Sequence, residues 1–191
     1  ADSAQFSRLE VLYPSGWELL NFLMDARTGL GRFKTFRISN YALMMDLIDY
    51  CRSHGIDDIL QLPDVVERVD MYFEYETLAK EQIQKCTKVH NNLAVLDLRH
   101  EETIYPTNRF VVYALYPQTN ISIHVMWGLN KQNVVFATGK SILNRTSNTN
   151  IGELMLKYGG GGHLNAGTCQ VPVEDSERVL SELISQINSD S

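Results

Sequence analysis

The spacing of the hydrophobic residues changes near residue 90, and this change constrains the fold more than any other feature of the sequence. Before it, apolar residues recur every three to four positions, as on the buried face of α-helices. After it, apolar and β-branched residues alternate along short segments, as in β-strands. We therefore expect a helical first part, followed by a sheet with helices packed on it.

Three helices are predicted in the first part. They cover residues 14–25, residues 39–55 with Ser39 as a candidate N-cap, and a long segment that begins at Pro63 and runs to about Cys86. Four aromatic residues at helical spacing are expected in the core: Trp17, Tyr41, Tyr72 and Phe73.

Five later segments have the pattern of strands: 92–98, 109–117, 120–127, 133–139 and 166–172. The short connections between three of them predict antiparallel neighbours. Helices are expected at 150–159 and 174–188. The predicted fold is α/β: a helical linker region, then a mixed, mostly antiparallel sheet of about five strands with flanking helices.

The composition is that of an ordinary soluble globular protein, with 44% hydrophobic and 21% charged residues. No apolar stretch is long enough to span a bilayer and the first residues lack the pattern of a signal peptide, so we expect a cytoplasmic protein without a membrane partner. A net charge of −6 argues against binding to long duplex DNA but permits a short anionic ligand. Cys51, Cys86 and Cys169 lie far apart in the sequence, and we expect buried thiols rather than a disulfide or zinc site.

Residues 157–167 read KYGGGGHLNAG. The four glycines have two interpretations: a turn at a helix end, or a nest of backbone N–H groups that binds an anion. In the second interpretation the candidate phosphate-binding residues are Gly160, Gly161 and Gly162, together with His163, since imidazoles exchange protons near neutral pH.

Three residues on a neighbouring strand end and loop would complete such an anion pocket: Lys140, Ser141 and Arg145. The alternatives are structural. Lys140 and Arg145 would then belong to a solvated loop face, and His163 would cap a helix end. His124 lies opposite the isoleucine face of its strand and is expected to be exposed.

The Gly-rich run, His163 and the pair Ala166-Gly167 resemble the C-terminal DHH-associated domain of the DHH phosphoesterase superfamily. Where that family carries a Leu-Arg-Ser-like stretch, this chain has Gly139-Lys140-Ser141. Lys replaces the usual Arg there, so a phosphate would be held by a point charge with less geometric selectivity.

The first forty residues resemble the end of a DHH catalytic domain. Asp25-Ala26-Arg27-Thr28-Gly29 matches an Asp-Thr-Gly motif with two interposed residues, and Phe36-Arg37-Ile38-Ser39-Asn40 follows in the form typical of exopolyphosphatase-related members. By this resemblance Asp25 corresponds to a metal-ligating Asp. The family's Asp-x-Asp and Asp-His-His motifs are missing from this sequence.

The resemblance implies three domains: residues 1–40 as the C-terminal remnant of a DHH catalytic domain, 41–87 as a helical linker and 88–191 as the DHH-associated substrate-binding domain. We expect Mn²⁺ or Mg²⁺ in the full-length protein, and no metal tightly bound to this chain, because a two-metal site needs several converging carboxylates and imidazoles. The chain is expected to be part of a longer protein and inactive by itself.

The implied function is the substrate-binding portion of a metal-dependent phosphoesterase. It would hydrolyse phosphoester or phosphoanhydride bonds of short oligonucleotides, cyclic dinucleotides or polyphosphate. The alternative is a non-enzymatic RNA- or nucleotide-binding module related to the C-terminal domain of alanine-type tRNA synthetases, with Tyr113, Tyr116 and Trp127 as exposed aromatic residues on the sheet. Single-stranded nucleic acid and a homodimer stay open as partners.

Overall fold

The computed structural model describes residues 4–191 and divides into two compact units. The helical unit contains the residues up to Gln82 together with Tyr105–Ala114. The sheet unit contains Ile83–Ile104 and Leu115–Ser191. The predicted domain boundaries after residues 40 and 87 stay predictions.

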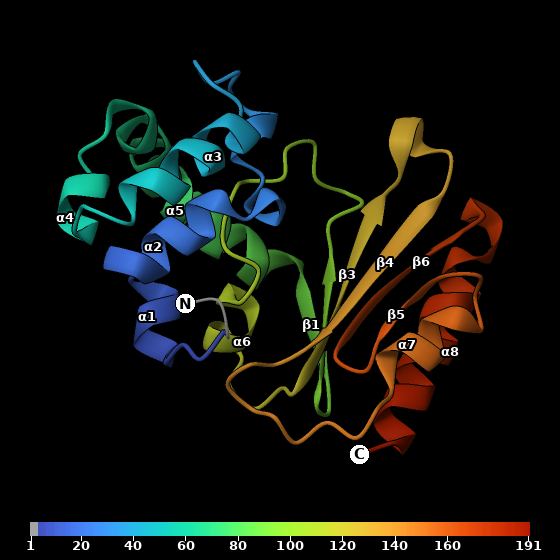
Figure 1. The fold of residues 1–191 in the computed structure, drawn as a ribbon. Helices are drawn as coiled ribbons and strands as arrows, with labels where there is room; N and C mark the ends of the chain where they lie inside the picture. The colour runs from blue at the N-terminus through green and yellow to red at the C-terminus, as the bar shows by residue number, and fades with distance from the viewer. Residues whose placement is uncertain (1–3) are drawn as a thin grey trace. The chain divides into compact units, whose positions relative to one another are not determined.

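The helical unit is built from short helices around the long helix α5. Its helices are α1 (Arg8–Leu12), α2 (Gly16–Met24), α3 (Asn40–Tyr50), α4 (Ile56–Ile59), most of α5 (Pro63–Cys86) and α6 (Val111–Leu115), with 3-10 turns at Ala26–Thr28 and Leu30–Arg32 (Figure 1). Local caps begin two of them. Ser7 and Glu10 form a capping box at α1, and the Ser39 hydroxyl accepts a hydrogen bond from Ala42 N at α3.

The helices predicted at 14–25, 39–55 and 63–86 are confirmed as α2, α3 and α5. The strand predicted at 109–117 is wrong, because Val111–Leu115 form helix α6. Nearly the whole of α6 is buried, so its apolar residues show no period that would reveal a helix. Asn108 starts the turn, since its side-chain oxygen accepts a hydrogen bond from Phe110 N at 3.1 Å.

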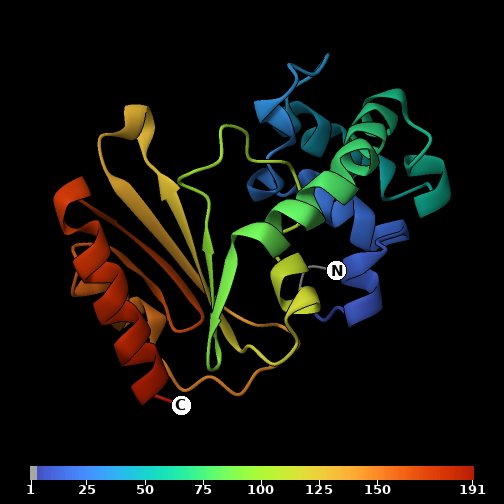
Figure 2. The ribbon, with the colours of Figure 1, turned by 180° about the vertical axis from the view of Figure 1, so that it is seen from behind.

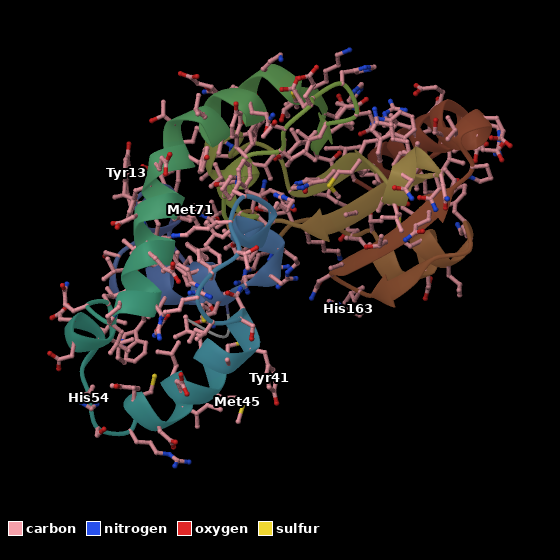
Figure 3. All side chains as sticks on the ribbon, turned by 90° about the horizontal axis from the view of Figure 1, so that it is seen from above. Tyr13, Tyr41, Met45, His54, Met71 and His163 are labelled. Atoms are coloured by element: carbon pink, nitrogen blue, oxygen red, sulfur yellow. The ribbon has the colours of Figure 1, made fainter. Side chains whose placement is uncertain are left out.

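Only one of the four aromatic residues expected in the core is buried there. Tyr72 is buried, whereas Trp17, Tyr41 and Phe73 are exposed, Tyr41 by 73%. Tyr41 belongs to an exposed stripe on α3 that also includes Met44, Met45 and Ile48, and Figure 3 shows Tyr41 and Met45 projecting from this helix. The helical spacing therefore predicted α3 correctly, but the apolar face that it marked is exposed to solvent.

The sheet unit contains six strands and two helices on one face. The strands are β1 (Thr87–His90), β2 (Leu93–Asp97), β3 (Ile121–Trp127), β4 (Val134–Lys140), β5 (Gly161–His163) and β6 (Ala166–Val171), in the order β1-β2-β3-β4-β6-β5. Only β2 and β3 are parallel among the paired strands of the described residues. The predicted mixed, mostly antiparallel α/β fold is confirmed, with β1 and β5 as strands that the sequence pattern missed.

Helices α7 (Ile151–Leu156) and α8 (Ser176–Ser189) cover the same face of this sheet, as both views show (Figures 1 and 2). We call it the covered face. Its core contains Ile121, Ile123, Val125 and Phe136 from the strands and Met155 and Leu183 from the helices. Because side chains alternate along a strand, the residues between these point to the opposite face, which we call the second face.

The cysteines differ from the expectation of buried thiols. Cys169 is buried, Cys86 is partly buried and Cys51 is exposed. No helix among residues 4–191 is long and apolar enough to cross a membrane.

Candidate functional site

The first two glycines of the run end helix α7. Gly159 has a φ of +75°, the left-handed conformation that favours glycine after a helix, and the Gly160 N–H donates to the carbonyl of Met155 at 3.0 Å. The helix-end interpretation therefore holds for this half of the run.

The close approach of β6 explains why two positions are glycine. A Cβ atom at Gly160 would lie 2.1 Å from the carbonyl oxygen of Thr168, and one at Gly162 would lie 2.3 Å from that of Ala166. Both contacts are with the backbone, which cannot rotate away as a flexible side chain could. Larger residues would therefore push β6 aside.

Gly161 is different from its neighbours. Apart from Gly161 and its two chain neighbours, no heavy atom of residues 4–191 lies within 4 Å of the position that its Cβ would take, and its φ is not in the left-handed region. Neither packing nor backbone conformation in the described residues therefore requires a glycine there. A ligand that approaches the backbone closely is a physical reason for a glycine that the fold does not need.

The three N–H groups do not form the predicted nest. Gly160 uses its N–H at the end of α7, and Gly161–His163 are extended as β5, paired with β6. Successive N–H groups of a strand point to opposite sides, so they cannot converge on one anion. β5 is the last strand of the sheet order, and an edge strand directs alternate N–H groups away from its partner.

His163 lies on this edge strand, and its side chain is exposed (Figure 3). The Asn165 N–H donates to the ring Nδ1 at 3.3 Å. Since Nδ1 is the acceptor, the neutral ring carries its hydrogen on Nε2, where it can donate to a ligand. The alternative of a helix-terminal cap is wrong, because His163 lies in a strand and α7 ends at Leu156.

Lys140 lies at the end of β4, close to the turn that follows His163. The Lys140 N–H donates to the carbonyl of Asn165 at 2.9 Å, so Asn165 connects the backbone of Lys140 with the ring of His163. The Lys140 ammonium donates to the carbonyl of Ser147 at 3.1 Å. By strand alternation the Lys140 side chain is on the covered face.

Ser141 and Arg145 organise the loop after β4. Ser141 is buried, and its hydroxyl accepts hydrogen bonds from Leu143 N and Asn144 N at 3.1 and 3.0 Å. The exposed Arg145 donates from Nε to the carbonyl of Ile142 at 3.0 Å. Ser141 therefore shapes the loop, while Arg145 is the member of the predicted pocket that presents a charge to solvent.

Asp25 lies in the helical unit and binds guanidinium groups. Its Oδ1 accepts from Arg27 Nε at 2.8 Å and its Oδ2 accepts from Arg27 Nη2 at 2.8 Å, while Arg109 Nε lies 3.6 Å from Oδ2. Burial raises the pKa of the Asp25 carboxyl, but the hydrogen bonds from Arg27 outweigh this and hold the pKa below its usual range. Both carboxylate oxygens are thus engaged by cations.

The aromatic residues expected on an exposed sheet face do not form one. Tyr113 is buried in helix α6, and the Trp127 ring N–H donates to the carbonyl of Arg99 at 2.8 Å. Tyr116 follows α6 and is partly buried, with its hydroxyl 3.4 Å from the carbonyl of Gln84. The stacking surface on which the RNA-binding alternative depended is therefore not present as predicted.

Solved structures reveal the relationships of this chain. Over its whole length it is similar to the pGpG-specific phosphodiesterase PggH from Vibrio cholerae, with 69% sequence identity and a TM-score of 0.91. This similarity bears out the predicted resemblance to the DHH phosphoesterase superfamily. The chain covers 65% of the length of PggH, just under two thirds.

A second solved structure shares the fold. It is an exopolyphosphatase-related protein from Bacteroides fragilis, 18% identical to this chain, with a TM-score of 0.50. The match covers 76% of this chain and 42% of that protein. A scan of family models and a search of curated proteins returned no match.

The superfamily resemblance implies a divalent metal, and the residues described here do not fit one. Among residues 4–191, no group of three or more His, Cys, Asp or Glu side chains is placed to hold a metal ion. The matching residue Asp25 has both oxygens bound by Arg27, and the nearby Arg109 adds a second positive charge. A metal cation at Asp25 would have to displace these guanidinium groups, so no reaction step is assigned to a metal here.

Proposed function

We propose that this chain forms the substrate-binding part of a phosphodiesterase that acts on short linear dinucleotides of the pGpG kind. The observation that carries the proposal is the 69% identity with a pGpG-specific phosphodiesterase across the entire chain. Identity at this level makes a shared ligand class the simplest expectation, although the chain spans 65% of that protein. Hydrolysis itself is proposed for the full-length protein.

Edge strand β5 is the proposed contact with a substrate phosphate. The exposed His163 presents Nε2–H as a donor, and the open Gly161 lets a phosphate oxygen approach the backbone. Arg145 adds an exposed positive charge from the loop after β4. In this proposal Lys140 and Ser141 position that loop through their hydrogen bonds to Ser147 O, Leu143 N and Asn144 N.

A divalent metal, Mn²⁺ or Mg²⁺, is proposed for the full-length protein and not for this chain alone. Such an ion would polarise the phosphate and lower the pKa of a bound water. The role of this chain is then to hold the dinucleotide in a fixed orientation, which lowers the entropic cost of the reaction elsewhere in the protein. The metal role of Asp25 stays a prediction.

Titration with pGpG, followed by NMR of the backbone amides and imidazole groups, tests the proposal. We expect chemical-shift changes at Gly161 and His163, and weaker binding by His163→Gln. His100→Gln is the matched control, since His100 is an exposed imidazole on the loop after β2 of the same unit. If pGpG shifts neither residue, or if both variants bind it equally well, the proposed binding site is wrong.

A further inference from the structure

The second face of the sheet carries two rows of small residues that lead away from the proposed phosphate contact. Strand pairing places the members of each row side by side across β5, β6, β4 and β3. The first row contains His163, Ala166, Gly139 and Ser122, and the second contains Gly161, Thr168, Ala137 and His124. Gly161 and His163 are thus the edge members of a surface that continues inward.

The middle of this surface carries only small residues. Three of its residues have no side chain or a single methyl group: Ala137, Gly139 and Ala166. All three are partly exposed, and Thr168 beside them is exposed. We call these four residues the shelf. A planar ring can lie close to the backbone on such a shelf, because no side chain holds it away.

His124 is the innermost residue of the second row. Its side chain is partly buried, which corrects the expectation of an exposed sheet residue. Within residues 4–191 its ring makes no hydrogen bond or ion pair. Burial lowers the pKa of His124 to about 4, so the imidazole is neutral at physiological pH. A neutral imidazole offers one N–H donor and one nitrogen acceptor, and both lack a protein partner.

The distance across the shelf suits a nucleotide whose phosphate lies at the edge strand and whose base lies toward His124. β5 and β3 are separated by β6 and β4, and three strand spacings of roughly 4.8 Å give about 14 Å between the strands of His163 and His124. A phosphate at the edge strand therefore leaves the shelf for the attached base.

We propose that the shelf binds the guanine base of the dinucleotide, with His124 and the Thr168 hydroxyl hydrogen-bonding to the edge of the base. This inference rests on the proposed function, because it places the base relative to a phosphate at His163 and Gly161. It assigns base selectivity to the second face and phosphate affinity to the edge strand.

The test compares the affinities of pGpG and pApA for the wild-type chain and three variants. We expect the wild type to prefer pGpG. Thr168→Val and His124→Leu should each reduce this preference by about tenfold, since each removes one hydrogen-bonding partner of the base. His163→Gln should weaken both dinucleotides equally and leave the preference unchanged.

Thr168→Val keeps the test decisive, because Thr168 is exposed and valine has nearly the same shape, so this variant retains the fold. A direct readout is the nuclear Overhauser effect between guanine H8 and the methyl protons of Ala137 and Ala166. The shelf does not bind the guanine base if Thr168→Val keeps the preference for pGpG over pApA, or if guanine H8 contacts only residues outside the shelf, even when pGpG binds. A wild-type chain that binds neither dinucleotide refutes the proposed function as well.

Discussion

Alanine substitutions along the glycine run should separate positions that the fold requires from the position that a ligand requires. At Gly160 the new Cβ would lie 2.1 Å from Thr168 O, 2.6 Å from Cys169 Cβ and 2.7 Å from Cys169 Cα. Ordinary contacts of a Cβ begin at 3.4 Å, so the strand must shift by more than 1 Å, roughly the overpacking that costs about 1–3 kcal/mol. Gly162→Ala should behave similarly, since its Cβ would lie 2.3 Å from Ala166 O.

Gly161→Ala should leave the free energy of unfolding within about 0.5 kcal/mol of the wild type, because the methyl group enters open space. If a phosphate approaches this backbone, the same methyl group should lower the affinity for pGpG by about tenfold or more. Gly31→Ala is the matched control, since its Cβ position is equally open and lies in the helical unit.

Urea unfolding and calorimetric titration with pGpG measure both effects for each variant. Close contact with β6 does not require a glycine at position 160 if Gly160→Ala unfolds at the same urea concentration as the wild type. The ligand does not approach the backbone of Gly161 if Gly161→Ala and Gly31→Ala both bind pGpG with the affinity of the wild type.

Three further predictions concern other parts of the chain. The pKa of His124 is lowered from 6.5 to about 4 in the folded protein, so the free energy of unfolding should be highest above pH 6.5 and fall by about 3 kcal/mol as the pH drops from 6.5 to 4. Urea titrations should show a flatter dependence of this free energy on pH for His124→Leu. Arg68 is fully buried and donates to Ile38 O and Asn40 Oδ1, so Arg68→Met should destabilise the helical unit by about 3 kcal/mol in hydrogen exchange; unchanged protection of α3 amides would contradict this. Mn²⁺ added to this chain should cause no selective paramagnetic broadening near Asp25, and strong local broadening there would show that the Arg27 pair yields to a metal.

Local chemistry made several elements predictable. The long helix from Pro63 to Cys86 was predicted with its bounds because proline at the first turn and a repeating apolar face act within a few residues. Strands β3 and β4 were predicted because their side chains largely alternate between a buried and a less buried face. Strand β2 is buried on both faces, and its short apolar run predicted it. The same sequence signals failed at α6, which is buried all round, and at β5, whose glycines have no pattern at all.

The sequence alone determined the α/β class, the DHH superfamily resemblance and the Gly-rich segment as the candidate site, because each depends on residues close together in the chain. Only the tertiary structure decided what each glycine does. Gly160 and Gly162 face the carbonyls of β6, whereas Gly161 faces open space, and this difference depends on a strand that follows after the turn. The tertiary structure likewise places His124, which is distant in sequence, in the same row as Gly161, because strand pairing creates neighbours that no local pattern encodes.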